Sequence, residues 1–125
     1  PARVSTVRPM PDTYERLALV DDATLARRIA SGSPGTTSEE EAELYRRFAP
    51  RVRLYGRRHL RDQAASDDLA QQVLLRTIER LRAGEVRRPE EIGSFILGTS
   101  RMMAQAERST AQRRQAIVTR FMERE

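Results

Sequence analysis

The sequence predicts a small all-α protein, and three observations support this prediction. Apolar residues recur at helical spacing, and no stretch alternates apolar and polar residues long enough to indicate a strand. Aspartate, serine and glycine residues stand where helices of ordinary length would begin and end. With 125 residues, 38% of them hydrophobic, the chain can bury one modest core. We therefore expect one compact bundle of about four helices.

The first of these helices is expected to begin at Asp21 or Asp22, since either carboxylate can cap a first turn. Leu25 and Ile29 lie one turn apart and give the helix an apolar side. Gly32 follows, at the position where a glycine in the left-handed conformation commonly ends a helix.

A second, longer helix is expected after a loop at residues 31–38. Ser38 and Glu41 have the spacing of a capping box, which indicates that the helix begins there. Its apolar side consists of residues that recur at helical spacing: Leu44, Phe48, Val52 and Tyr55. Pro50 lies within this pattern and lacks a backbone donor, so it predicts a kink, or two abutting helices, near residues 46–47.

A third helix is expected to begin at Asp62, which can cap it, and to end at Gly84. Its buried side is predicted to contain Leu74, Ile78 and Leu81, which share one helical face.

The last long helix is expected to follow a polar loop at residues 82–93, with Ser94 as its cap. Two neighbouring faces are predicted to be apolar, the first containing Phe95, Thr99, Met102 and Ala106 and the second Ile96 and Met103. We expect Phe95 to be a core residue of this helix. The domain is thus expected to comprise residues 21–108, after an N-terminal arm with a short helix at 1–20. Residues 109–125 are expected to form a charged tail or linker.

Charge is unevenly distributed along the chain, which carries 23 basic residues, all of them arginine, and a net charge of +5. Residues 46–61 contain seven arginines and no acid, whereas residues 62–75 contain three aspartates and no base. This separation suggests two partners of opposite sign. Plainer explanations remain open: GC-rich coding bias explains the use of arginine instead of lysine, and the arginines of residues 46–61 can form a solvated face.

The composition argues against catalysis and against a membrane location. No cysteine is present and the single histidine, His59, has no clustered ligand, so we expect no metal and no other cofactor. No grouping of nucleophile and base, and no phosphate-binding glycine motif, indicates an enzyme. The sequence has no apolar run of membrane-spanning length, and residues 1–11 lack the apolar core of a signal peptide. We expect a cytoplasmic protein that is not an enzyme.

Four segments, considered together, have the order of a known module. The most specific is residues 68–76, with the sequence Asp-Leu-Ala-Gln-Gln-Val-Leu-Leu-Arg. The others are residues 21–32, residues 44–52, which include the unusual Pro50, and residues 94–97, followed by an arginine at position 101. Together they resemble region 2 of bacterial sigma factors, in particular the small extracytoplasmic-function (ECF) type.

The resemblance implies a polymerase-docking helix at residues 68–76. In that family this helix docks on a coiled coil in the clamp of the largest RNA polymerase subunit, and a negative surface suits a basic coiled coil. The residues expected to contact the polymerase are Asp68, Leu69, Gln71 and Gln72. Without the resemblance, the helix macrodipole is the favoured explanation, since acids are common in a first helical turn.

The resemblance also implies that the loop at residues 82–93 holds a base flipped from the non-template strand of the promoter minus-ten element. Arg87 and Arg88 are then expected to hold the neighbouring phosphates. Further arginines are expected to follow duplex phosphates along the last helix: Arg101, Arg108, Arg113 and Arg114. An ordinary solvated turn remains the plain alternative for the loop.

Three positions depart from the family pattern. Gln72 stands where an acid is usual, Met102 where Asn is usual, and Ala106 where Asp is frequent. The loop at residues 31–38 is longer than usual, and the chain stops before a second DNA-binding domain, as expected of a fragment or a one-domain variant.

The expected function is that of a sigma factor domain that directs RNA polymerase to promoters, recognises the minus-ten element and assists strand opening. A second hypothesis is a module that binds polymerase or an anti-sigma factor without opening DNA. A third is an unrelated helix-turn-helix repressor, which would need a second recognition helix after a tight turn.

Overall fold

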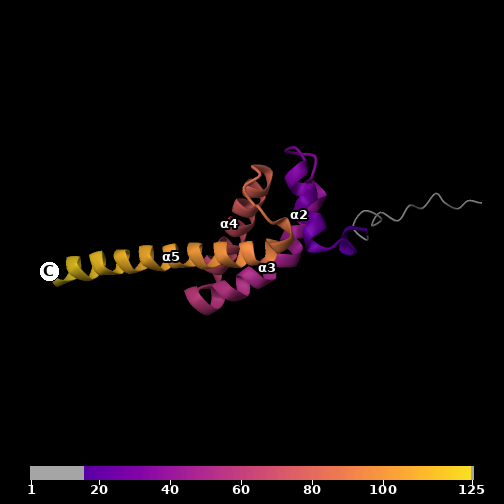
Figure 1. The fold of residues 1–125 in the computed structure, drawn as a ribbon. Helices are drawn as coiled ribbons and strands as arrows, with labels where there is room; N and C mark the ends of the chain where they lie inside the picture. Colours follow the sequence, from indigo (N-terminus) through magenta and orange to yellow (C-terminus); the bar gives the residue numbers. More distant parts are fainter. Residues whose placement is uncertain (1–15, 125) are drawn as a thin grey trace, which may run out of the picture.

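The computed structural model describes residues 16–124, and this part of the chain folds as helices without a strand (Figure 1). Its elements are, in order, α2 (Asp22–Ser31), α3 (Ser38–Leu60), α4 (Gln63–Arg82), the 3₁₀ helix η2 (Pro89–Glu91) and α5 (Ile92–Glu123). The predicted all-α class is confirmed. Most of the arm expected at residues 1–20 lies outside the described residues.

Helix α2 begins where the sequence predicts but ends for a different reason. The carboxylate of Asp21 accepts a hydrogen bond of 2.7 Å from the amide of Thr24, and this bond lowers the pKa of Asp21. Gly32 has φ −92°, so the expected left-handed conformation is wrong. Glycine suits this position because a Cβ there would lie 2.3 Å from Cγ2 of Thr37.

Helix α3 is one helix, with Thr37 as its N-cap residue. The expected capping box is wrong, because the carboxylate of Glu41 accepts a hydrogen bond of 2.8 Å from the hydroxyl of Thr37, not from Ser38. The two-helix alternative is also wrong, since α3 continues through Pro50. Phe48 and Val52, on either side of Pro50, are both buried in the core, and this packing offsets the hydrogen bond that proline cannot make.

Helix α4 follows the prediction closely. Asp62 is its N-cap and accepts a hydrogen bond of 3.1 Å from the amide of Ala64. Gly84, with φ +72°, follows the helix in the left-handed conformation that glycine adopts without strain. The buried side contains the predicted Leu74, Ile78 and Leu81.

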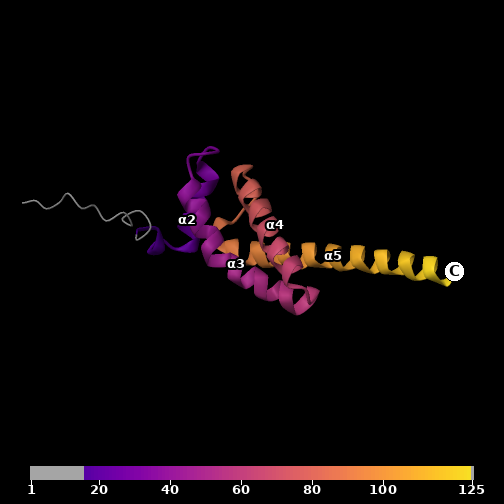
Figure 2. The ribbon, with the colours of Figure 1, turned by 180° about the vertical axis from the view of Figure 1, so that it is seen from behind.

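Helix α5 begins earlier and continues further than the sequence suggests. Pro89 starts η2, which leads directly into α5 at Ile92, so the expected cap Ser94 already lies inside the helix. The charged tail at residues 109–125 is helical as far as Glu123. Figures 1 and 2 show α5 crossing the other helices and then extending beyond them toward the C-terminus.

The buried face of α5 also differs from the prediction. It contains Ile92, Ile96, Thr99, Ser100 and Ala104. Among the residues expected there, Met102 is 59% exposed and Ala106 is exposed, while Phe95 is half-buried against the core. The hydroxyl of Ser100 donates to the carbonyl of Ile96 at 2.8 Å, which lets a polar residue lie in the core.

An arginine connects the N-terminal part of the fold to α3. Arg47 donates to the carboxylates of Asp22 and Glu43, each at 2.8 Å, and to the carbonyl of Leu17 at 2.6 Å. Because Glu43 is buried, its carboxylate needs the ion pair with Arg47 to compensate for the loss of solvent. The network links the start of α2 to α3.

Candidate docking and nucleic-acid surfaces

The acidic side of α4 is the first candidate site. It is formed by exposed polar side chains within two turns of the helix: Asp67, Asp68, Gln71 and Gln72. Asp68 accepts a hydrogen bond of 3.0 Å from Nε2 of Gln72, one turn further on. Asp67 pairs with Nε of Arg53 at 3.4 Å, so part of its charge is balanced within the chain. We call these four residues the acidic face.

The position of Asp67 and Asp68 within α4 shows whether the helix macrodipole can explain these two acids. Because the helix begins at Gln63, Asp67 and Asp68 lie in its second turn, and its first turn contains no acid. The interaction of a charge with the helix macrodipole falls off within the first turn. The macrodipole therefore explains these two acids less well than the sequence suggested.

Two leucines of α4 differ in exposure, and the expected contact is the buried one. Leu69, an expected polymerase contact, is only 5% exposed and packs in the core, so little of its side chain is available to a partner. Leu75 is 61% exposed and lies seven positions after Asp68, on the same side of the helix. Sequence reasoning missed Leu75, although its spacing from Asp68 and from the buried Leu74 indicated an outward position.

The three positions that depart from the family pattern lie together in space. Gln72 of α4 and Met102 and Ala106 of α5 line one hollow between the two helices. Arg76 and Glu107 line it as well. The three positions expected to depart from the family pattern thus share one surface, which includes Gln72 of the acidic face.

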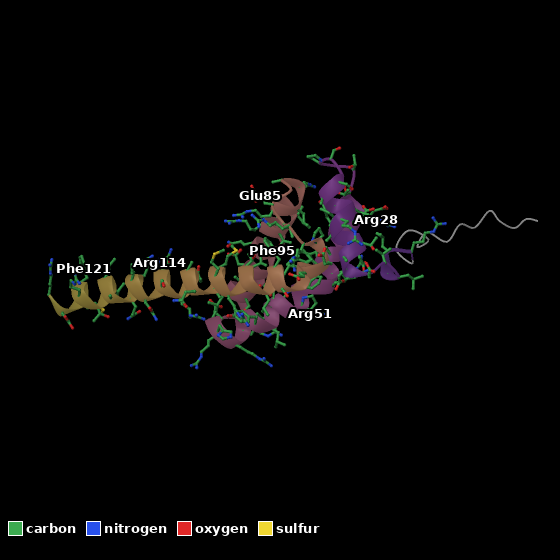
Figure 3. The ribbon with its side chains drawn as sticks, viewed as in Figure 1. Arg28, Arg51, Glu85, Phe95, Arg114 and Phe121 are labelled. Atoms are coloured by element: carbon green, nitrogen blue, oxygen red, sulfur yellow. The ribbon has the colours of Figure 1, made fainter. Side chains whose placement is uncertain are left out.

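The loop between α4 and α5 is the second candidate site. A hollow there is lined by Val86, Arg87 and Arg88 of the loop and by Ser94 and Phe95 of α5. The structure thus brings the two arginines expected to bind phosphate to the same hollow as an aromatic ring. Figure 3 shows Phe95 on α5 close to the loop.

Ion pairs limit the freedom of this loop. Arg88 pairs with the carboxylate of Glu91 at 3.2 Å, and Glu85 pairs with Arg80 of α4 at 3.3 Å. All four side chains are substantially exposed, so a phosphate can displace either carboxylate at little cost in free energy. We call residues 83–91 the α4–α5 loop.

The arginines expected to follow a DNA duplex do not form a single track. Arg101 and Arg108 are seven positions apart and therefore lie on one side of α5. Arg113 and Arg114 come five and six positions after Arg108 and point in other directions, on the part of α5 that extends past the bundle (Figure 3).

The arginine-rich part of α3 is divided between structural and exposed side chains. Arg46, Arg47 and Arg53 form ion pairs with acids of the chain. The remaining four, Arg51, Arg57, Arg58 and Arg61, are exposed. Tyr55 is half-buried and its ring stacks on His59, with 4.1 Å between centroids.

Comparison with known proteins gives one match. A family model described as sigma-70 region 2 matches residues 44–114, which include most of α3, all of α4, the α4–α5 loop and α5 as far as Arg114. No curated protein and no solved structure matches the chain significantly.

None of the helices within residues 16–124 is long and apolar enough to cross a membrane. In the same residues, no three histidine, cysteine, aspartate or glutamate side chains gather in a way that could hold a metal ion.

Proposed function

Because the chain belongs to the sigma-70 region 2 family, we propose that it is the region 2 domain of an ECF-type sigma factor. The family consists of transcription initiation factors, not enzymes, that bind RNA polymerase and promoter DNA. The observation that carries the proposal is the extent of the family match, since residues 44–114 include both the acidic face and the α4–α5 loop. The ECF type is inferred from the sequence of residues 68–76 and from the segment that begins at Ser94.

The acidic face docks, in this proposal, on the clamp coiled coil of the largest polymerase subunit. Asp68, Gln71 and Gln72 supply polar contacts, and Leu75 supplies an exposed apolar contact on the same side of α4. Leu69 contributes from the core, by holding this side of α4 in place. Opposite charges on the two surfaces speed their encounter and select the orientation of docking.

The α4–α5 loop holds a flipped base of the non-template strand, and Arg87 and Arg88 bind the phosphates beside it. Extruding a base costs a few kcal/mol, which contacts in the hollow have to offset. The half-buried ring of Phe95 offers a stacking surface there. Arg101 and Arg108 contact duplex phosphates upstream, whereas Arg113 and Arg114 contribute general attraction to DNA.

NMR titration of the chain tests both assignments at once. Adding the isolated clamp coiled coil is expected to shift resonances of Asp68, Gln71, Gln72 and Leu75. Adding single-stranded DNA is expected to shift Arg87, Arg88 and Phe95 instead. If both additions shifted the same residues, the assignment of two separate surfaces would be wrong.

A second function is favoured by one observation, the shared hollow of Gln72, Met102 and Ala106. A surface changed at all three departing positions suits a module that binds polymerase or an anti-sigma factor without opening DNA. The single-stranded DNA titration separates the two functions, because this module would give no base-dependent shifts.

A further inference from the structure

A pocket between α3 and α5 is not used by either proposed surface. It has a volume of about 170 Å³ and is lined by Phe48, Val52 and Tyr55 of α3 and by Gly93, Ile96 and Leu97 of α5. None of its lining residues belongs to α4 or to the α4–α5 loop. Both proposed surfaces can therefore be occupied while this pocket binds something else.

The lining of the pocket favours an apolar occupant. Ser100 is the one residue with a hydroxyl on the α5 side of the lining, and that hydroxyl already donates to the carbonyl of Ile96 at 2.8 Å. Pockets for drug-sized ligands usually measure about 300–1,000 Å³. A volume of about 170 Å³ is better matched to one large apolar side chain, the anchor that typically dominates a protein interface.

The rim of the pocket favours a negatively charged partner. Arg51, labelled in Figure 3, lines the pocket. Its guanidinium lies over the ring of Phe48, 5.1 Å from the ring centroid. Residues 46–61 and 92–106, the stretches of α3 and α5 that form the pocket, contain no acid. Arg58 lies two turns beyond Arg51 on the same side of α3.

We propose that this pocket docks an acidic amphipathic helix of a partner protein, with one large apolar side chain in the pocket and carboxylates beside Arg51 and Arg58. Leu97, which is 43% exposed at the rim, packs against a second apolar residue of that helix, one turn from the anchor. This inference goes beyond polymerase and promoter binding and does not depend on either.

Two other occupants fit less well. An unpaired base needs several hydrogen-bond partners for its polar edges, whereas the lining offers only the guanidinium of Arg51 and the hydroxyls of Tyr55 and Ser100, the last of which already bonds to Ile96. The ring of Tyr55 also already stacks on His59. A second copy of the chain would bring another positive charge of +5 to a positively charged rim.

A pair of glycines on α5 allows a matched test. A Cβ on Gly93 would lie 3.7 Å from Cε1 of Phe48, an ordinary contact, so Gly93→Ala occupies pocket space without strain. A Cβ on Gly98 would meet nothing within 4 Å, so Gly98→Ala is the control. Both changes favour helix formation, which keeps the two variants folded.

The probes are two synthetic peptides of about 18 residues, long enough to form a helix. They share a leucine-bearing face and carry either glutamate or lysine on the other. The glutamate peptide is expected to bind the wild type and Gly98→Ala equally, and to bind Gly93→Ala about tenfold more weakly. Arg51→Glu should weaken binding as well, whereas Arg57→Glu, at an exposed position that does not line the pocket, should not.

Three results would overturn the proposal. The first is equal affinity of the two glycine variants for the glutamate peptide. The second is binding of the lysine peptide as tightly as the glutamate peptide. The third is binding of single-stranded DNA that Gly93→Ala weakens and Gly98→Ala does not, which would assign the pocket to a nucleotide.

Discussion

Gly56 of α3 and Ser66 of α4 approach each other so closely that a Cβ on Gly56 would lie 3.0 Å from the Cα of Ser66. Ser66 is fully buried, and its hydroxyl donates to the carbonyl of Asp62 at 2.8 Å. This close approach holds the start of α4 against the end of α3. It therefore determines the direction in which the acidic face projects.

Gly56→Ala should destabilise the protein by about 1–3 kcal/mol, because the backbone at Ser66 cannot move away as a flexible side chain could. The free energy of unfolding in urea measures the effect. Gly98→Ala is the matched control and should leave stability unchanged or raise it by about 0.5–1 kcal/mol. Equal stability of Gly56→Ala and the wild type would show that the two helices can separate freely.

Replacing Asp68 and Gln71 together by arginine should abolish binding to the isolated clamp coiled coil, because it reverses the charge of the acidic face. The change should cost at most about 1 kcal/mol of stability near an exposed helix start, which circular dichroism checks. Glu123→Arg, at an exposed position at the far end of α5, serves as the control and should bind nearly as the wild type does. Undiminished binding by a folded double variant would reject the acidic face as the docking site.

Leu75→Ala should weaken coiled-coil binding by about 1 kcal/mol, since it removes an exposed apolar side chain from the docking surface. Its stability should stay within about 0.5 kcal/mol of the wild type, because the side chain is 61% exposed. Leu97→Ala, an exposed leucine outside α4, provides the control in the same titration. If both leucine variants bound like the wild type, Leu75 would not belong to the docking surface.

Replacing Arg87 and Arg88 by alanine should flatten the salt dependence of single-stranded DNA binding by up to about two counterion units, one for each phosphate that these arginines bind. Arg27 and Arg28, adjacent and exposed on α2, give a double-alanine control that should retain the wild-type slope. Fluorescence anisotropy at several salt concentrations measures the slope. If the loop is only a solvated turn, the variant without Arg87 and Arg88 will have the same slope as the wild type.

The capping carboxylate of Asp21 should make the free energy of unfolding depend on pH under acidic conditions. The hydrogen bond from Thr24 lowers the pKa of Asp21 below its ordinary value of 3.8, so the ionised carboxylate favours the folded state. This contribution is present above pH 3.8 and is lost as the pH falls through the lower, folded pKa. Asn can also cap a helix, so Asp21→Asn removes only the charge. The stability difference between wild type and variant should shrink in acid, and a constant difference in urea unfolding would contradict this.

The sequence predicts a helix end best where the residues at that end determine it. Asp62 and Gly84 bound α4 as expected, because a capping carboxylate and a left-handed glycine act locally. The prediction for Gly32 is wrong because the role of this glycine depends on the methyl group of Thr37, which lies beyond the helix. The buried face of α5 is predicted only in part: Ile96 and Thr99 are buried as expected, whereas Met102 and Ala106 are exposed. Ser100 enters the core by bonding to its own helix, which hydrophobic periodicity does not count.

The sequence predicts the candidate site only in part, for the same reason. Exposed polar residues such as Asp68 and Arg87 follow from the sequence pattern. The burial of Leu69, the exposure of Leu75 and the meeting of Gln72 with Met102 depend on how α4 and α5 pack together. Such packing is a property of the whole fold and is not visible in either helix alone.

The most direct test of the central claim is a selection of random single-stranded oligonucleotides on the complex of this chain with core RNA polymerase. We expect the complex to enrich one short motif, the minus-ten element, that core polymerase alone does not enrich. Recovery of the same unselected pool by the complex and by core polymerase, with the chain demonstrably bound, would contradict promoter recognition by this domain.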